Sequence, residues 1–427
     1  MKLTRRSLLA GAVGGVAVAA CGPRAAWDEG ASGQAEAEGL AAELEGIAAE
    51  PVLQKDLLPE PVILESMELL RNGEEILVRA RSKDGAEGLS VTNSWWLFDT
   101  HPIFLRRVAP YLVGKDARDL EENLEGLLRE EITYKLQGLA LWSCVAAAEM
   151  AVLELLGRVS GKPIGDLLGG AQRRDIPVYR ASGNRGNTPE EEVEFLRGLV
   201  AETGASAIKI RLGSELGENR DSAPGRTKAL IPAVREAFGD EMTLYADANS
   251  SYDAEHAIPV GRLLEASGYA FYEEPCRFDD LWETKKVADA LDIPVAGGEQ
   301  EFSERRFRWT IENQGLDVVQ PDLHYYGGYI RAARVARMAH AAGMTCTPHM
   351  SGWGLGYLNA LHFMSFIPNP APHLEFKGLS GIPFQCDTSP LDCVDGIMRV
   401  PSGPGFGIDL DPDWVRKARV VQSGVSL

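Results

Sequence analysis

The sequence has little positive charge. Its 427 residues include 62 Asp and Glu but only 43 Lys and Arg, which gives a formal net charge of −19. It also has no basic stripe with interleaved aromatic residues, so phosphate repulsion should dominate any encounter with DNA or RNA. We therefore expect no nucleic-acid partner. The acidity does not exclude a small anionic substrate, because a bound metal ion can invert the field locally.

Cysteine is scarce as well, and the six cysteines follow no spacing that is typical of a zinc site. Hydrophobic residues make up 45% of the chain and charged residues 25%, which is the composition of a globular protein. A chain of this length should form one or two domains.

The first hydrophobic run is too short for a transmembrane helix. It covers the 13 residues Leu8–Ala20, mostly small, and follows the pair Arg5-Arg6. The run leads into Cys21 through Val18-Ala19-Ala20, which resembles a bacterial lipoprotein processing site, and the paired arginines resemble a twin-arginine export signal. We interpret residues 1–21 as a signal that sends the protein to the periplasm, where a lipidated Cys21 would anchor it to the membrane. A plain secretion signal is the alternative.

The next segments differ sharply in composition. Residues 22–54 are rich in Ala, Glu and Gly and poor in large apolar side chains, which predicts a flexible linker or a marginal helix and not a packed element. Apolar and charged residues then alternate as far as about residue 93, with Asp84-Gly85 as a hairpin signal, and this predicts two or three antiparallel strands. Helical patterns follow, the most apolar from Ala140 to Leu156. We therefore expect residues 55–172 to form an α+β domain.

Six acidic or imidazole side chains form a ladder of nearly equal steps in the second half of the chain. Each ends a short apolar run, and helical patterns fill the intervals. The steps are 26, 26, 23, 27 and 26 residues, between Asp247, Glu273, Glu299, Asp322, His349 and Glu375. A strand–helix unit of this length is the repeat of a (β/α)₈ barrel, whose catalytic groups lie at the C-terminal ends of the strands. The ladder predicts an α/β, TIM-like barrel over residues 173–380 with one mouth.

The first three carboxylates, Asp247, Glu273 and Glu299, come from successive predicted strands and should converge within metal-binding distance. Oxygen ligands without Cys or His favour a hard divalent cation such as Mg²⁺, with Mn²⁺ as an alternative. One such carboxylate alone could simply cap a helix, but three at matched spacing indicate a metal site. A base for proton abstraction needs a pKa near the working pH, and His349 with Asp322 nearby meets that need.

Short motifs surround these positions, and together they are specific. They are YADAN (245–249), YEEP (272–275), GGEQ (297–300), QPDLHYYGG (320–328), TPH (347–349), and LLGG (167–170) followed by IPVY (176–179). This set resembles the enolase superfamily, mandelate racemase subgroup. The resemblance implies a modified (β/α)₇β barrel with an N-terminal capping domain. It also implies Mg²⁺ ligation by the three carboxylates, an Asp322–His349 dyad, and a Glu375 that hydrogen-bonds the substrate carboxylate.

The second predicted barrel strand departs from the family's pattern. The family has Lys-x-Lys there, whereas this chain has Lys209-Ile210-Arg211. Alternation points both charged side chains to the barrel centre, and the resemblance implies that Lys209 contacts the metal-bound carboxylate. Arginine stays protonated and is a poor proton acceptor, so Arg211 should act electrostatically and a two-base racemisation is disfavoured. His349 alone suffices for dehydration, because it can return its proton to the departing hydroxide.

A dehydration substrate would be a polyhydroxy carboxylate, that is, an acid sugar. Candidate substrate-binding side chains near the mouth are Arg180, Asn249, Tyr325 and, on a predicted capping loop from Asn93 to His101, Trp96. Three alternatives remain: a racemase or epimerase with a second base (Arg211, His324 or a tyrosine), a cycloisomerase, and a non-catalytic sugar-acid-binding lipoprotein.

We expect residues 381–427 to pack back on the capping domain. By analogy with related proteins, we also expect a homo-oligomer.

Overall fold

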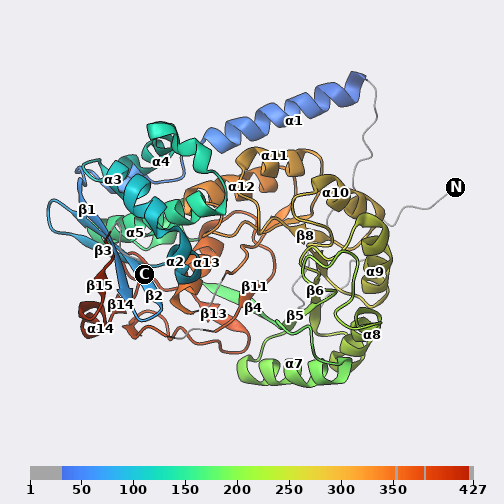
Figure 1. Cartoon of the computed structure of the whole chain (residues 1–427). Helices are drawn as coiled ribbons and strands as arrows, with labels where there is room; N and C mark the ends of the chain where they lie inside the picture. The colour runs from blue at the N-terminus through green and yellow to red at the C-terminus, as the bar shows by residue number, and fades with distance from the viewer. Residues whose placement is uncertain (1–30, 352–353, 379–380, 423–427) are drawn as a thin grey trace.

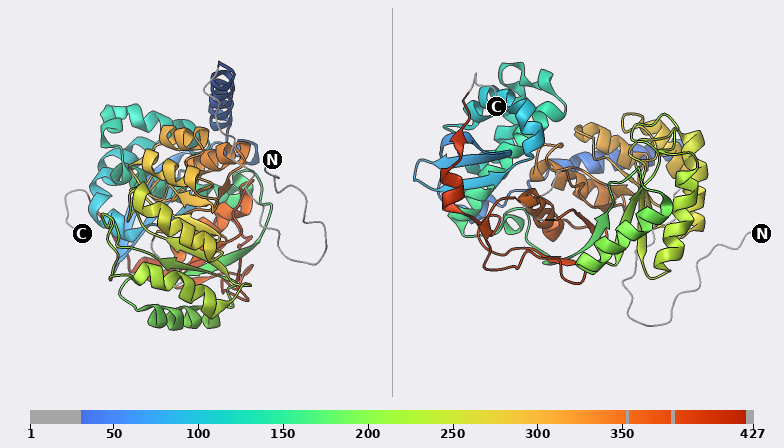
Figure 2. Two further views of the ribbon diagram at one scale, coloured as in Figure 1. Left: turned by 90° about the vertical axis from the view of Figure 1, so that its right-hand side faces the viewer. Right: turned by 60° about the horizontal axis from the view of Figure 1, so that its bottom comes forward.

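The structure is a computed structural model that describes residues 31–351, 354–378 and 381–422 (Figure 1). The predicted export signal at 1–21, with Cys21, lies outside the described residues. An antiparallel sheet with its helices forms one body, and a ring of parallel strands surrounded by helices forms the other. Figure 2 shows the two bodies side by side, with the C-terminal segment returning to the first.

The first body is built on a four-stranded antiparallel sheet of order β15–β1–β2–β3. Its strands are β1 (Leu64–Asn72), β2 (Glu75–Ser82), β3 (Glu87–Val91) and β15 (Arg419–Val420). The predicted hairpin at Asp84-Gly85 is confirmed, since Arg81 pairs with Glu87 across a turn in which Gly85 has a φ of 85°. The helices are α2 (Ser94–Ile103), α3 (Ala109–Leu112), α4 (Leu120–Arg129), α5 (Leu139–Ser160) and α6 (Ile164–Leu167).

Helix α5 is the apolar helix that the sequence predicted, and it forms the core of this body. It is long and apolar enough to cross a membrane, yet 89% of its most apolar window is buried inside the protein. It packs on β2 and β3. A Cβ added at Gly88 of β3 would lie 2.4 Å from the backbone nitrogen of Leu155, so glycine there is what lets the helix approach the sheet.

The second body is the predicted (β/α)₇β barrel. Its parallel strands are β4 (Asp175–Ala181), β5 (Ala207–Arg211), β6 (Thr243–Asp247), β7 (Phe271–Glu273), β8 (Val295–Gly297), β9 (Val318–Val319), β10 (Thr345–Cys346) and β11 (Leu374–Phe376). They run in the order β10–β9–β8–β7–β6–β5–β4–β11. A parallel bridge between Cys346 and Pro370, just before β11, closes the ring.

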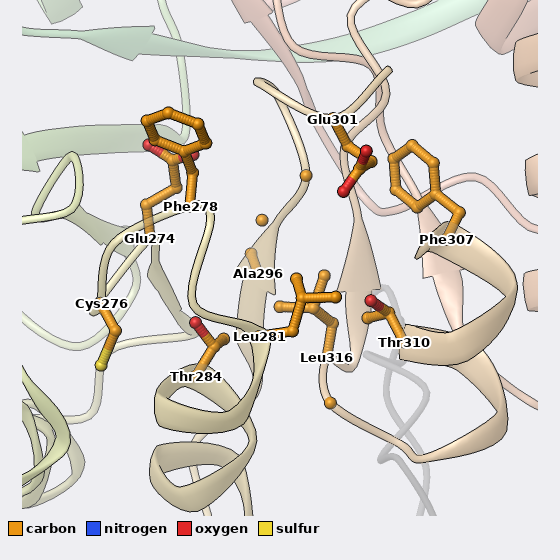
Figure 3. Close-up of a pocket in the computed structure, with 13 residues that line it drawn as sticks. Glu274, Cys276, Phe278, Leu281, Thr284, Ala296, Glu301, Phe307, Thr310 and Leu316 are labelled. Carbon is orange, nitrogen blue, oxygen red and sulfur yellow. The ribbon is translucent and has the colours of Figure 1, made fainter. Parts of the chain in front are cut away.

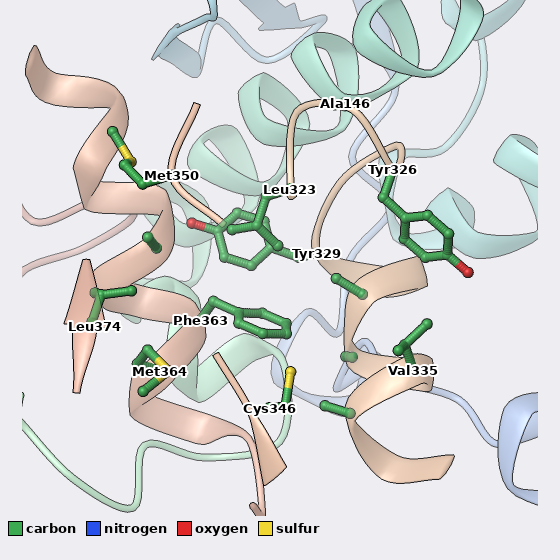
Figure 4. Close-up of a cluster of buried hydrophobic side chains, with 14 of the residues drawn as sticks. Ala146, Leu323, Tyr326, Tyr329, Val335, Cys346, Met350, Phe363, Met364 and Leu374 are labelled. Atoms are coloured by element: carbon green, nitrogen blue, oxygen red, sulfur yellow. The ribbon is translucent and has the colours of Figure 1, made fainter. Parts of the chain in front are cut away.

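One helix follows each of the first seven barrel strands and covers the outside of the ring (Figure 1). The helices are α7 (Pro189–Thr203), α8 (Arg226–Phe238), α9 (Ala254–Ala266), α10 (Leu281–Ala290), α11 (Glu304–Glu312), α12 (Tyr329–Ala341) and α13 (Tyr357–Phe366). Figure 4 shows part of the core, where Tyr329 and Phe363 of two barrel helices pack near Ala146 of α5. The hydrophobic core therefore continues from one body into the other.

The C-terminal segment contacts both bodies. It contains β12 (Phe384–Gln385), β13 (Ile397–Arg399), β14 (Asp409–Leu410), α14 (Pro412–Arg416) and β15. β15 pairs with β1 of the capping sheet, as the expected return requires, whereas β13 pairs antiparallel with β4 of the barrel.

The region expected to be a flexible linker or a marginal helix contains helix α1 (Ala31–Ala49), and this helix is a packed element. Leu44 and Ala48 are buried, α1 packs on α11 and α12 (Figure 1), and Glu45 lies 3.7 Å from Arg308. The physical reason is that Ala and Glu have high helix propensity. A few apolar side chains are then enough to pack the helix, because the barrel helices provide the apolar surface on which they are buried. Composition alone did not reveal this packing.

Candidate active site

Three carboxylates meet at the C-terminal ends of consecutive strands. Asp247 ends β6, Glu273 ends β7, and Glu299 follows β8 by two residues. One oxygen from each lies within 4.8 Å of the other two, and all three side chains are buried. Two residues earlier on the same strands, Tyr245 and Phe271 fill the barrel interior. The next inward-facing positions therefore bring Asp247 and Glu273 to the mouth.

Two buried cations of β5 face these carboxylates, as the alternation of the strand predicted. Lys209 Nζ lies 2.8 Å from both carboxylate oxygens of Glu273 and 3.5 Å from Asp247 Oδ2. Arg211 forms an ion pair with Asp247. Burial alone would lower the pKa of Arg211, but the surrounding carboxylates, Glu375 first among them, raise it above its ordinary value. Arg211 is therefore a permanent cation and not a base.

His349 and Asp322 form the expected dyad. His349 Nδ1 lies 2.7 Å from Asp322 Oδ2, and Asp322 Oδ1 accepts the backbone N–H of His324 and the hydroxyl of Ser351. His349 Nε2 lies 3.5 Å from Glu299 Oε2, so it faces the carboxylate cluster. Burial acts to lower the pKa of His349, but Glu299 and Asp322 outweigh it and raise the pKa above its ordinary value. The ring is thus oriented by Asp322, with Nε2 directed toward the carboxylate cluster.

Glu375, on β11, reaches the same space. Its Oε1 lies 3.9 Å from Lys209 Nζ, 3.9 Å from Arg211 Nη2 and 3.6 Å from Lys377 Nζ. Burial would raise the pKa of Glu375, but these three cations hold it well below its ordinary value. Neither of its oxygens has a hydrogen-bond partner among the described residues. Glu375 is therefore an ionised hydrogen-bond acceptor. A hydrogen bond between it and a substrate carboxylate would require a proton shared by the two carboxyl groups.

Asn249, Tyr325 and Trp96 lie around this mouth. The backbone N–H of Asn249 donates to Asp247 Oδ1 at 2.7 Å. Trp96 Nε1 donates to the Tyr325 hydroxyl at 2.9 Å, and the Tyr325 ring is 6.1 Å from the ring of His349. The capping segment expected to be a loop, Asn93 to His101, is instead the N-cap and most of helix α2. It nevertheless reaches the barrel mouth.

The structure places Arg180 away from the mouth, in contrast to the sequence interpretation. Its Nη2 lies 3.2 Å from Glu202 Oε2 of α7, and its guanidinium lies over the Phe376 ring. Its neighbour Tyr179 points into the barrel, and adjacent residues of a strand face opposite sides. Arg180 therefore lies between the sheet and its helices, and counting residues from a strand end without knowing the register gave the wrong face.

Comparison with known proteins identifies the family. The enolase C-terminal domain-like family model matches residues 191–414, and the model of the mandelate racemase / muconate lactonizing enzyme N-terminal domain matches residues 53–169. This chain belongs to the mandelate racemase subgroup of the enolase superfamily. The resemblance drawn from the motifs is thereby confirmed.

Several members of this subgroup are similar over most of the chain. D-Galactarolactone cycloisomerase of Agrobacterium fabrum is 31% identical over 323 residues, which cover 73% of this chain and 82% of that protein. L-Talarate/galactarate dehydratase of Salmonella typhimurium is 30% identical over 340 residues, 78% of this chain and 80% of that protein. A mandelate racemase/muconate lactonizing protein from Paracoccus denitrificans, solved in complex with magnesium, superposes with a TM-score of 0.77. It is 28% identical, over 85% of this chain and 100% of that one.

The carboxylate cluster of this subgroup member suits a divalent cation. Three buried carboxylates in one place repel one another, and Glu299 Oε2 has no hydrogen-bond partner among the described residues. All available donors are hard oxygens, which Mg²⁺ and Mn²⁺ prefer. Asp247, Glu273 and Glu299 therefore fit such an ion.

Two polar contacts of this enolase-superfamily site were missed in the sequence. Gln320 is buried and donates from Nε2 to Glu273 Oε2 at 3.1 Å, and Ser351 links Asp322 to Asn93 of the capping segment. Gln320 could have been found, because it precedes Asp322 by two residues and so faces the same side. Ser351 lies in irregular backbone after β10, where no alternation of side chains indicates the direction in which it points.

A separate small pocket lies behind this site, between β8 and the helices α10 and α11 (Figure 3). Its volume of about 40 Å³ is too small for an acid sugar. Glu274 and Glu301 reach it from one end, and Leu281 and Leu316 are among the residues that line the rest. By its size it is not the substrate cavity.

Proposed function

We propose that this enzyme removes the proton next to the carboxylate of an acid sugar and expels the neighbouring hydroxyl as water, which yields a 2-keto-3-deoxy acid. The observation that carries the proposal is an asymmetry of the site. One side has an imidazole held by a carboxylate, His349 with Asp322, and the other has an arginine paired with Asp247. Dehydration needs one base, whereas racemisation needs one on each face of the carbon. The talarate/galactarate dehydratase, at 30% identity, supports the same reaction class.

Asp247, Glu273 and Glu299 would hold the metal ion, Mg²⁺ or alternatively Mn²⁺. When bound, the ion supplies electrostatic stabilisation of the negative charge that develops on the substrate carboxylate. Lys209, bonded to Glu273, adds a second positive charge at the same end of the site. Substrate hydroxyls would meet Asn249, Tyr325 and the free oxygens of Glu375.

His349 would carry out both proton transfers. Its Nε2 accepts the proton from the carbon next to the carboxylate, while Asp322 stabilises the resulting imidazolium through Nδ1. The electron pair of the broken C–H bond forms the C–C double bond as hydroxide leaves the next carbon. His349 then returns its proton to that hydroxide, which departs as water, and the remaining enol tautomerises to the 2-keto acid.

An isomerase is the second candidate, and the D-galactarolactone cycloisomerase at 31% identity is the observation that favours it. Such a reaction would use the same dyad without net loss of water. A racemase or epimerase would need a second base, and Arg211 is excluded by its ion pair. Burial lowers the pKa of His324, which makes it a weak acceptor. A binding protein without turnover would have no use for the complete dyad.

The test is a screen of the purified protein with Mg²⁺ in D₂O against a library of acid sugars. We expect a 2-keto acid from at least one substrate, and a loss of about 10³-fold or more in kcat for His349→Asn, since general-base catalysis contributes on this scale. Deuterium at the carbon next to the carboxylate of recovered substrate, without keto acid, would instead establish the isomerase. Full activity of His349→Asn would contradict both.

We further propose, from the sequence of residues 1–21, that the protein is exported and anchored through a lipidated Cys21. Expression of the full chain in a bacterium with labelled palmitate should give a labelled membrane fraction, and Cys21→Ala should release unlabelled protein into the periplasm. Retention of the wild-type protein in the cytoplasm would contradict this proposal.

The expected homo-oligomer is tested by light scattering on a sizing column, where a monomeric mass would contradict it.

A further inference from the structure

A third arginine, Arg185, reaches the mouth from the loop between β4 and α7. Its Nη2 donates to the side-chain oxygen of Asn249 at 2.5 Å. The same oxygen accepts from Arg211 Nη1 at 3.1 Å, so two guanidinium groups share one amide oxygen. Arg185 is half-buried whereas Arg211 is buried. Arg185 therefore lies on the outer, entrance side of Asn249.

The loop that carries Arg185 is held in place by a buried arginine. Arg226 donates three hydrogen bonds to backbone carbonyls: Nε to Asn187 at 2.7 Å, Nη1 to Arg211 at 3.1 Å and Nη2 to Asn184 at 3.3 Å. The carbonyls of Asn184 and Asn187 flank Arg185, and that of Arg211 ends β5. This clamp fixes the loop to the barrel, so the position of Arg185 is preorganised for a ligand.

Arg185 lacks the negative partner that balances Arg211. Arg211 has Asp247 and Glu375 as partners, but no carboxylate of the described chain lies within 4.0 Å of the Arg185 guanidinium. The Nε of Arg185 is buried and has no hydrogen-bond partner there either. Burial, and next to it the charge of Arg211, lowers the pKa of Arg185 to about 10, although the more distant Glu215 acts in the opposite direction. A partly buried cation that is crowded by another cation and has no carboxylate in ion-pair distance should bind an anion strongly.

We propose that Arg185 binds a second carboxylate at the far end of the substrate, so that the enzyme prefers dicarboxylic sugar acids over their monocarboxylic counterparts. The inference rests on the proposed function, in which the reacting carboxylate occupies the metal end of the site. Asn249 lies between the two ends, since its Nδ2 donates to Asp247 Oδ2 at 3.2 Å while its Oδ1 accepts from Arg185, so a second group of the substrate would face Arg185. A planar carboxylate suits the guanidinium fork, and Arg185 is positioned to donate to it from Nε.

The experiment compares matched pairs of substrates that differ only at the terminal carbon: D-gluconate with D-glucarate, and D-galactonate with galactarate. The full chain with Mg²⁺ should show a kcat/KM about 10-fold or more higher for the dicarboxylic member. Arg185→Gln should lose about 100-fold on that member, mainly through KM, and only about 5-fold on the monocarboxylic one. For Arg185→Lys, which keeps the positive charge but not the planar fork of donors, the loss on the dicarboxylic member should lie between zero and the loss of Arg185→Gln.

The control is Arg197→Gln, which removes an exposed arginine from the adjacent helix α7 and should leave both members of each pair unaffected. An equal loss on both members in Arg185→Gln would overturn the inference. So would a wild-type preference for the monocarboxylic member, or for 6-phosphogluconate over D-glucarate, which would assign Arg185 to a phosphate.

Calorimetry with the catalytically impaired His349→Asn protein separates this inference from the proposed function. Binding of D-glucarate or galactarate that weakens about 100-fold on adding Arg185→Gln supports the inference even if no keto acid ever forms from these acids in the wild type. Keto-acid formation that is insensitive to Arg185 supports the proposed function and overturns the inference. Absence of any dicarboxylate binding also overturns the inference.

Discussion

Two sets of buried carboxylates in this protein differ in how their oxygens are satisfied. On α5, both oxygens of Glu149 accept backbone N–H groups, from Tyr329 and Ile330 at the start of α12. At the barrel mouth, neither oxygen of Glu375 and only one oxygen of Glu299 has a hydrogen-bond partner among the described residues. Both sets are almost fully removed from solvent. The difference is therefore one of partners and not of burial.

Glu154, further along α5, repeats the first pattern. It accepts from Arg158 at 2.7 Å and from the backbone N–H of Phe406 in the C-terminal segment. The carboxylates of α5 thus join the capping domain to the barrel and the tail. An unsatisfied buried charge costs stability, so the unpartnered oxygens of Glu299 and Glu375 are explained by ligands that complete them. The comparison separates the carboxylates of α5, which join parts of the fold, from Glu299 and Glu375, which keep oxygens free for a ligand.

The largest expected effects come from making the same truncation in each set. Glu299→Ala should reduce kcat/KM by about 10³-fold, because a metal ligand is lost. In EDTA, its unfolding free energy should stay within about 1 kcal/mol of wild type, because a repelling charge is also lost. Glu149→Ala should lower the unfolding free energy by about 3 kcal/mol, because two buried N–H groups lose their acceptor.

Urea denaturation and steady-state kinetics measure both quantities. The activity of folded Glu149→Ala should remain within about 3-fold of wild type, since this side chain lies outside the mouth. The comparison breaks if Glu299→Ala unfolds the protein, or if Glu149→Ala abolishes turnover while leaving stability intact.

A smaller effect concerns the pH dependence of stability. Burial raises the pKa of Glu149 from 4.5 to about 8, against the pull of its two N–H donors. Because the folded-state pKa lies above the unfolded one, the stability that this group contributes is complete below pH 4.5 and is lost as the pH rises through 8. Between pH 5 and pH 8, wild type should therefore lose more unfolding free energy than Glu149→Gln, which does not titrate. Parallel pH profiles of the two proteins would show that this carboxyl is ionised throughout.

The smallest expected effect lies where the capping domain touches the mouth. Trp96→Phe removes the hydrogen bond to the Tyr325 hydroxyl but keeps an aromatic ring. A neutral hydrogen bond contributes about 1 kcal/mol, so KM should rise about 5-fold with little change in kcat. The matched control is Trp95→Phe, whose side chain is 74% exposed and should leave KM unchanged. Equal changes in KM for the two substitutions would show that Trp96 has no specific role in substrate binding.

Much of the barrel and its ring of charges could be predicted from the sequence. Asp247 and Glu273 end short strands, Glu299, Asp322 and His349 closely follow short strands, and one strand–helix period separates neighbouring members, so local patterns were sufficient. Arg180 was misplaced because one residue of register decides which side of a strand a side chain faces. The packing of helix α1 was missed because its few apolar side chains form a core only together with α11 and α12.

The hydrogen bonds that complete the site could not be predicted from the sequence, because they too join residues that are far apart along the chain. Arg185 and Asn249 share a contact across 64 residues, and Asn93 meets Ser351 across 258 residues. Such contacts depend on how loops from different strands are folded over one mouth, and no local pattern encodes that. Periodic elements were predictable, whereas side chains in irregular backbone were not.

The most direct test of the central claim is a titration of the metal-free full chain with Mn²⁺, followed by electron paramagnetic resonance. The account predicts one site per chain that Mg²⁺ displaces, that Glu299→Ala abolishes and that Glu149→Ala retains. Mn²⁺ binding that survives in Glu299→Ala, or that fails in Glu149→Ala despite a folded protein, would contradict the division between the two sets of carboxylates. Absence of any site in the wild type would contradict the metal-dependent chemistry itself.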